Sequence, residues 1–314
     1  MNRNIKWHIA FLVFAGLSLI MAVHMGAANI NIFSLTSTDM DILLKLRLPR
    51  IFLGLIVGAG LSVSGAILQS ILKNPLAEPY IIGSSAGAAM GTVIVAVAGL
   101  TLIKAPAAFI GSIGAVMLVY NISSISRRNS PQTLILAGVA VTSLFSAATL
   151  LFMVLKRESV YGILFFLMGS LADAGWDTVI WTAAAVIPVI IISLFYRRDL
   201  DILSLGDSEA SRMGVNSRNT GKIMLMVSSL AVGGCVAASG IIGFVGLIIP
   251  HVVRLTIGAS HRHLLPASAF AGAGFLVLCD GLARSVLAPV ELPVGIITAF
   301  AGAPFFIYLL IKKI

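Results

Sequence analysis

The most suggestive catalytic pattern in this sequence is Gly83-x-Ser85-x-Gly87, which has the spacing of a hydrolase nucleophile elbow. Such an elbow holds its serine on a sharp turn between a strand and a helix, so a strand must precede the motif. Here a proline-containing turn, Pro75 to Pro79, comes first, and small and apolar residues follow. We therefore expect Ser85 to permit close helix packing and not to act as a nucleophile.

A second pattern to test is nucleotide binding. The Gly-Lys pair of a phosphate-binding P-loop occurs only at Gly221-Lys222, where Ile223 follows in place of Ser or Thr. Asn216 occupies the position of the first glycine of that motif. We expect no ATP binding of the usual kind, so the free energy for any transport must come from a partner or from an ion gradient.

Histidines and cysteines are the remaining candidates for metal or haem ligation. His251, His261 and His263 occur in a basic segment, where imidazoles are most often surface groups, with a structural use expected for His251. Cys235 and Cys279 both lie in apolar stretches, which indicates packing residues and neither a disulfide framework nor a metal motif. We predict no metal site.

Acidic residues could drive a proton-coupled transporter if they lay within membrane spans. Glu78 and Glu291 fall at the ends of apolar runs, and Asp280, next to Arg284, is the partial exception. A gradient-driven transporter is expected to carry acidic groups inside its spans, facing a cavity. The pattern favours an external ATPase and leaves the gradient-driven transporter as the alternative.

Composition places all of these residues in a membrane protein. Of the 314 residues, 59% are hydrophobic and only 11% are charged, whereas about a quarter are charged in soluble domains. Apolar runs predict an all-α protein with about ten spans, the first retained and not cleaved as a signal peptide. The spans begin near Ile5, Ile51, Gly83, Ala105, Gln132, Asp177, Lys222, Ile241, Leu264 and Pro293, those from Ile241 and Pro293 being the shortest.

Charge distribution predicts the orientation. Two thirds of the 21 Lys and Arg residues fall in the loops on the side of the two termini. The positive-inside rule then places both termini in the cytoplasm. On that side the polar segment 197–222 interleaves apolar and charged residues, as expected of short amphipathic helices at the membrane surface. The net charge of +9 requires no nucleic-acid partner.

One span carries small residues at every fourth position, and a tight polar hairpin follows it. The small residues form a stripe on one helix face that lets a second helix approach closely. The hairpin, 73–79, contains two prolines and has little backbone freedom, as a fixed surface or gate would need. The stripe consists of Gly54, Gly58, Ser62, Ala66 and Ser70.

These residues closely resemble the FecCD/BtuC-type permeases, the membrane subunits of ABC importers for iron siderophores, haem and vitamin B12. The resemblance covers nearly the whole chain and rests on several blocks, among them 47–50, 74–79, 239–251 and 291–295. It implies the fold of a type II importer permease, forming one transmembrane domain over 1–314 with a cytoplasmic coupling-helix loop at about 198–221. It also implies a multi-pass transporter of the bacterial inner membrane and not an enzyme, without a cofactor of its own.

The resemblance implies four kinds of partner: an ABC ATPase dimer that binds ATP and Mg, an extracytoplasmic substrate-binding protein, a second permease copy or close paralogue, and the lipid bilayer. It also assigns residues to roles. Docking of the binding protein falls to Arg47, Arg50 and Arg284, and ATPase coupling falls to Gly206, Glu209, Ala210, Met213 and Gly214. The spacing from Glu209-Ala210-Ser211 to Gly214 is one residue shorter than in the commonest form of the family's coupling signature.

The resemblance further implies a cytoplasmic gate and a translocation path. The gate residues are Asn74, Leu76, Pro131 and Gln132, the last two in place of the small hydroxyl residues expected there. The fifth and tenth spans line the path, and the fifth carries the hydroxyl residues Thr142, Ser143, Ser146 and Thr149. A ferric siderophore is the expected cargo, with haem, cobalamin or an oxyanion as alternatives. A membrane scaffold or receptor is the remaining rival class.

Overall fold

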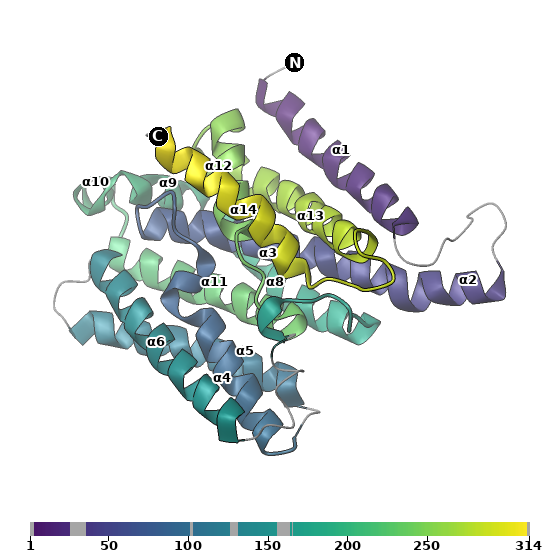
Figure 1. The fold of residues 1–314 in the computed structure, drawn as a ribbon. Coiled ribbons are helices and arrows are strands. Elements are labelled where there is room, and N and C mark those ends of the chain that lie inside the picture. Colours follow the sequence, from purple (N-terminus) through teal and green to yellow (C-terminus); the bar gives the residue numbers. More distant parts are fainter. Residues whose placement is uncertain are drawn as a thin grey trace.

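The described part of the chain is all-helical. The computed structural model describes residues 3–25, 36–100, 103–125, 131–155, 164 and 166–312, and contains no strand within them. The helices are α1 (Arg3–His24), α2 (Ser37–Ile42), the π-helical η1 (Leu43–Arg47), α3 (Leu48–Ile71), the 3-10 helix η2 (Pro79–Ile82), α4 (Ser84–Val97), α5 (Lys104–Ile125), α6 (Pro131–Leu155), α8 (Trp176–Phe195), α9 (Arg197–Leu205), α10 (Asp207–Arg212), α11 (Ser217–Ser239), α12 (Val245–Ile257), α13 (His261–Ser285) and α14 (Val294–Ile311) (Figure 1).

Ten apolar helices of this part correspond to the ten predicted spans. Seven helices are long and apolar enough to cross a membrane, and α4, α12 and α14 are shorter apolar helices. The prediction of the shortest spans was right for α12, with 13 residues, but α4, with 14 residues, is shorter than α14, with 18. The reason is local. Gly83 and Gly99, both with positive φ, flank α4 at its two ends.

The centre of the bundle is α3, which packs against α8, α11, α12 and α13. On the side of α13 its stripe of small residues makes close approach possible, as the sequence predicted: a Cβ added at Gly58 would overlap the carbonyl oxygen of Gly272. Gly65, which lies outside the stripe, allows the same approach on α12, where an added Cβ would overlap the carbonyl oxygen of Gly246. The backbones of three helices therefore approach more closely than larger side chains allow.

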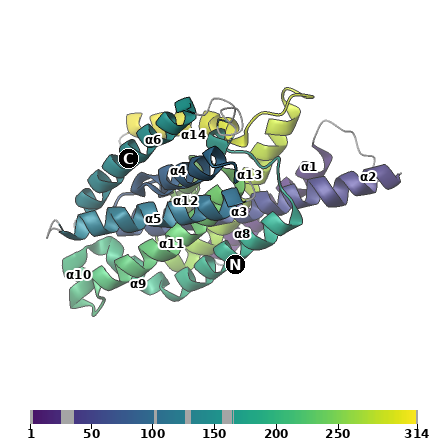
Figure 2. The same ribbon diagram turned by 90° about the horizontal axis from the view of Figure 1, so that it is seen from below.

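The bundle has two ends, which we name by the short helices they carry. At the α9–α10 end, the rings of His8 and His263 meet with centroids 5.3 Å apart, so α1 and α13 both begin there. The α2 end holds the other end of α13, where Arg284 donates to the carbonyl oxygen of Ala22 near the end of α1. Figures 1 and 2 show the C-terminus returning to the α9–α10 end. Both termini therefore lie at the same end of the bundle.

Candidate functional site

The α9–α10 end carries the predicted coupling segment as two short helices. They are joined at Gly206, whose φ of +130° lies in the region that favours glycine. Gly214, with φ of +79°, follows α10 and ends the segment in the same way. One or two short amphipathic helices were predicted for this stretch, and two are present, with Asp207 of α10 paired to Lys73 at 2.8 Å.

The exposed surface of this segment differs from the predicted set of coupling residues. Ala210 is completely buried against the chain's own helices, whereas Met213 is 54% and Leu205 64% exposed. Glu209 lies at the surface, where the hydrogen bond from Ser208 lowers the pKa of its carboxyl group. A partner can therefore contact Leu205, Glu209 and Met213 directly, whereas it cannot contact the buried side chain of Ala210.

A buried histidine connects α9 to the centre of the bundle. The Nδ1 atom of His261 lies 2.6 Å from the carboxylate of Asp201 on α9, and its Nε2 atom lies 2.7 Å from the hydroxyl of Ser70 on α3. Burial acts to raise the pKa of Asp201, but the hydrogen bonds and charge of His261 bring it below its ordinary value. This Asp201–His261–Ser70 link connects α9 to the start of α13 and to the end of α3.

The expectation of a surface group was wrong for His261, and His251, for which a structural use was expected, is buried as well. His261 is 2% and His251 8% exposed, because each is enclosed by helix packing that the basic segment does not reveal. The ring of His251 contacts Phe305 of α14, and neither of its nitrogens has a hydrogen-bond partner within the described ranges. His263 faces His8. In the part of the chain that the structure describes, no three potential ligands gather into a metal site.

The predicted gate hairpin is held by hydrogen bonds at both of its ends. The side-chain oxygen of Asn74 accepts from the Leu76 amide at 2.9 Å, which closes the turn. Glu78 accepts from the amide of Phe244 at 2.6 Å, just before α12. Burial is the larger influence and raises the pKa of Glu78 despite that hydrogen bond. The hairpin is thus fixed to the segment that leads into α12.

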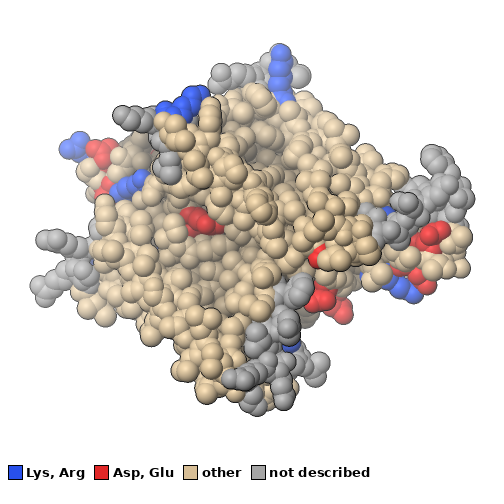
Figure 3. All heavy atoms as spheres, in the orientation of Figure 1, with Lys and Arg blue, Asp and Glu red and all other residues tan. Residues whose placement is uncertain are grey.

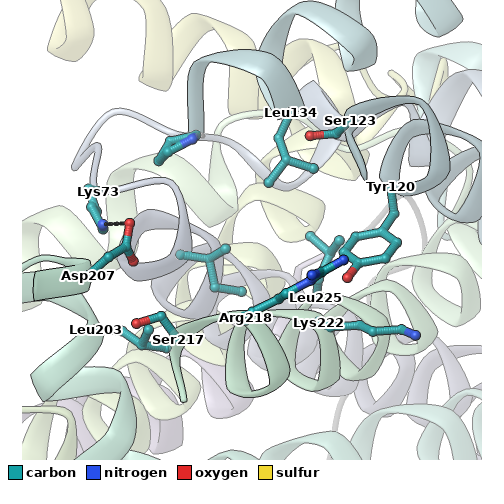
Figure 4. Close-up of a pocket in the computed structure, with 13 residues that line it drawn as sticks. Lys73, Tyr120, Ser123, Leu134, Leu203, Asp207, Ser217, Arg218, Lys222 and Leu225 are labelled. Atoms are coloured by element: carbon teal, nitrogen blue, oxygen red, sulfur yellow. Dashed lines mark ion pairs between the residues drawn. The ribbon is translucent and has the colours of Figure 1, made fainter. Parts of the chain in front are cut away.

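The second predicted gate element begins α6 beside this hairpin. Pro131 and Lys73 both line a pocket of about 270 Å³ between the ends of α3, α5, α6 and α9–α11 (Figure 4). Gln132 follows at the surface of α6. The structure therefore brings the two predicted gate elements to one pocket next to the coupling segment.

At the α2 end the predicted docking arginines are buried in an ion-pair cluster. Arg50 donates to both carboxylate oxygens of Asp280, with distances between 2.9 and 3.1 Å, and to Glu291 at 2.7 Å. Arg284 pairs with Asp280 at 3.1 Å. Arg47 donates to a backbone carbonyl near the end of α1 and is also buried. Sequence reasoning placed these arginines at one end but did not find Asp280 and Glu291 as their partners.

The predicted path residues lie on α6 with different surroundings. Ser143 and Ser146 are exposed, Thr142 is half-buried near Gly83, and Thr149 is buried. Figure 2 shows α6 and α14, the fifth and tenth spans, on the same side of the bundle. In Figure 3 this face is largely uncharged, with acidic atoms in a hollow at its middle. Large apolar side chains project from both helices, including Leu136, Leu150, Phe300 and Ile307.

Comparisons with known proteins identify what the chain is similar to. Residues 9–312 match the model of the FecCD transport family. The hemin transport system permease HmuU of Yersinia pestis is 38% identical, over 95% of this chain and 94% of its own. The cobalamin import permease BtuC of Halobacterium salinarum is 42% identical, over 88% of this chain and 75% of its own.

A solved structure agrees with these relatives at the level of the fold. It is described as a metal-chelate type ABC transporter in an inward-facing conformation. The two chains superpose with a TM-score of 0.90 at 33% identity, over 98% of this chain and 99% of the other. The all-helical architecture predicted from the sequence is therefore confirmed.

Proposed function

The chain belongs to the FecCD transport family, and from that premise we propose that it is the permease of an ABC importer that carries a ferric siderophore into the cytoplasm. The observation that supports this most is the similarity along almost the whole chain to a transporter of metal-chelate type. Haem and cobalamin are the alternative cargoes, because the two relatives carry those names. All are metal chelates, and the proposed mechanism is the same for each.

The α9–α10 end is the proposed seat of the ATPase. Leu205 and Met213 offer apolar contact there and Glu209 offers a charge, a combination suited to a peripheral partner. Two connections would transmit its motion. The Lys73–Asp207 ion pair joins α10 to the gate hairpin, and the Asp201–His261–Ser70 link joins α9 to α13 and α3. Closure of the ATPase dimer would thereby switch the permease between its two states.

The α2 end is the proposed docking surface for the binding protein. Asp280 holds Arg50 and Arg284 inside the bundle, so an acidic group of the partner can reach Arg50 only in competition with Glu291. The side chain of Glu291 is 42% exposed, which makes it the partner of Arg50 most open to exchange. Such charge pairs chiefly accelerate and orient docking.

The uncharged face with α6 and α14 is the proposed contact with a second permease. Its exposed apolar residues suit a neighbouring copy, and the exposed Ser143 and Ser146 suit a path at that contact. A path lined by small, apolar and hydroxyl side chains binds a chelate weakly and therefore lets it move through. Thr142 and Thr149 lie on less exposed parts of the same helix.

A substitution at the coupling surface tests the proposal. We expect Met213→Glu to lower ATP-dependent uptake in proteoliposomes while the chain still inserts and folds, because it places a charge in the ATPase contact. Leu100→Glu is the matched control, since Leu100 is 55% exposed and follows α4, away from α9 and α10. Equal uptake by the Met213 and Leu100 variants would contradict the proposed seat.

The cargo is tested with the cognate binding protein. Uptake of a radiolabelled ferric siderophore in the presence of that protein supports the siderophore as cargo. If haem or cobalamin is taken up and the ferric siderophore is not, that chelate is the cargo. Uptake that needs an ion gradient and no ATP would instead support a secondary transporter.

A further inference from the structure

The pocket between the ends of α5, α6 and α11 is lined by more basic than acidic side chains. Lys73, Arg218 and Lys222 line it, against the single carboxylate of Asp207. Asp207 forms an ion pair with Lys73 at 2.8 Å, whereas Arg218 and Lys222 form no ion pair with an acidic residue in the described part of the chain. Both are exposed at the mouth of the pocket. The lining therefore holds two positive charges that an anion can neutralise.

The helices that form the pocket add to this positive character. Two long helices, α6 and α11, begin at its wall, with Pro131 and Ser217 among the lining residues. The first turn of a helix presents unpaired backbone N–H groups and the positive end of the helix dipole. Two such starts beside two cations form a setting that favours negative charge.

An unpaired hydroxyl group is the independent sign of a ligand. Ser123 is only 1% exposed, its Oγ atom has no hydrogen-bond partner among the described residues, and it lines the pocket. A buried polar atom without a partner costs free energy unless something binds it. Figure 4 shows Ser123 and Tyr120 on α5 across the pocket from Arg218 on α11. The Ser123 hydroxyl and the Arg218 guanidinium therefore line the same pocket from two different helices.

The volume of the pocket and its lining side chains indicate which class of anion it can hold. The pocket measures about 270 Å³, below the usual range of roughly 300–1,000 Å³ for ligand pockets, so a nucleotide is too large for it. The remaining walls are aliphatic: Ile71, Leu134, Leu203 and Leu225. A phosphate group with a short apolar extension matches this combination of cations, hydroxyls and aliphatic walls.

We propose that this pocket is a phosphate-binding site whose occupant is the headgroup of an anionic phospholipid, held by Arg218, Lys222 and the Ser123 hydroxyl. The occupant would lie between the start of α6 and Asp207 of the coupling segment. Its presence would brace α6 against α10. The inference depends on the pocket and not on the identity of the cargo or the ATPase.

Native mass spectrometry of the full chain tests the site, with phosphatidylglycerol and phosphatidylcholine supplied in equal amounts. We expect selective retention of phosphatidylglycerol, and its affinity falling roughly tenfold or more in the double variant Arg218→Gln/Lys222→Gln. Lys312→Gln is the matched control. Its ammonium lies 5.6 Å from the Tyr308 ring centroid, much as Lys222 lies 5.5 Å from that of Tyr120, but Lys312 is outside the pocket.

Two further measurements separate the sources and the role of the hydroxyl. Displacement of phosphatidylglycerol by inorganic phosphate would show that the phosphate group is sufficient and that a soluble phosphate can also occupy the site. Ser123→Ala, which removes one buried oxygen, should lower retention without lowering the thermal unfolding midpoint. Equal retention in wild type and the double variant, or equal loss in the double variant and Lys312→Gln, would overturn the site.

Discussion

Asp280→Asn is the substitution with the largest predicted effect on the stability of this protein. Asp280 is 2% exposed and is the shared partner of Arg50 and Arg284, which are 9% and 4% exposed. The amide of asparagine keeps the shape of the side chain but removes its charge. Both guanidinium groups then remain buried, with only Glu291 as a carboxylate partner of Arg50.

The magnitude follows from the burial of these charges. Removing one partner of a buried ion pair typically costs about 3–5 kcal/mol, because it leaves a buried charge uncompensated. Here the uncompensated charge is that of Arg284, whereas Arg50 keeps its pair with Glu291. The control is Asp41→Asn. Asp41 pairs with Lys45 at 2.9 Å on α2, but the two side chains are 64% and 70% exposed, so about 0–1 kcal/mol is expected.

The assay is the free energy of unfolding of the full chain in detergent micelles, measured by circular dichroism during titration with a denaturing detergent. A double-mutant cycle with Arg50→Gln then isolates the pair, and we expect the double variant to lose less than the sum of the single losses. The reasoning is refuted if Asp280→Asn destabilises the chain no more than Asp41→Asn does.

Two further predictions concern the centre of the bundle and the Asp201–His261–Ser70 link. Gly58→Leu should cost about 1–3 kcal/mol of unfolding free energy because it overfills the contact with α13, whereas Gly16→Leu, which meets no atom within 4 Å, should cost little; equal costs would contradict the close approach. The lowered pKa of Asp201 means that the hydrogen bonds its carboxylate accepts from His261 stabilise the fold above the ordinary carboxylate pKa of 3.8 and lose that effect as pH falls through the lower folded value. The stability difference between wild type and Asp201→Asn should therefore shrink between pH 7 and pH 3, and a difference independent of pH would refute the link.

The fold was predictable because membrane spans are recorded locally in the sequence. Apolar length gave the ten helices, and the small residues at every fourth position of α3 predicted the close contact that Gly58 makes with Gly272. The alternation of charged and apolar residues after α8 predicted one or two surface helices, and two are present, α9 and α10. Each of these signals lies within a single element.

The partners of the charged residues were not predictable, because they are distant along the chain. Arg50 and Asp280 are separated by 230 positions, and Asp201 and His261 by 60. No periodicity relates such positions, so the arginines were expected to face a partner protein and His261 to face solvent. The helix packing that buries them depends on many contacts at once. The same holds for the pocket, whose lining comes from α3, α5, α6, α9, α10 and α11.

Uptake of a labelled metal chelate into proteoliposomes tests the central claim, that a separate ATPase drives this permease. The chain is reconstituted with and without its ATPase subunit, with the binding protein and cargo outside and a protonophore added in parallel. We predict uptake that requires the ATPase and ATP and persists when the protonophore abolishes the ion gradient. Uptake by the chain alone, without ATP and abolished by the protonophore, would contradict the account.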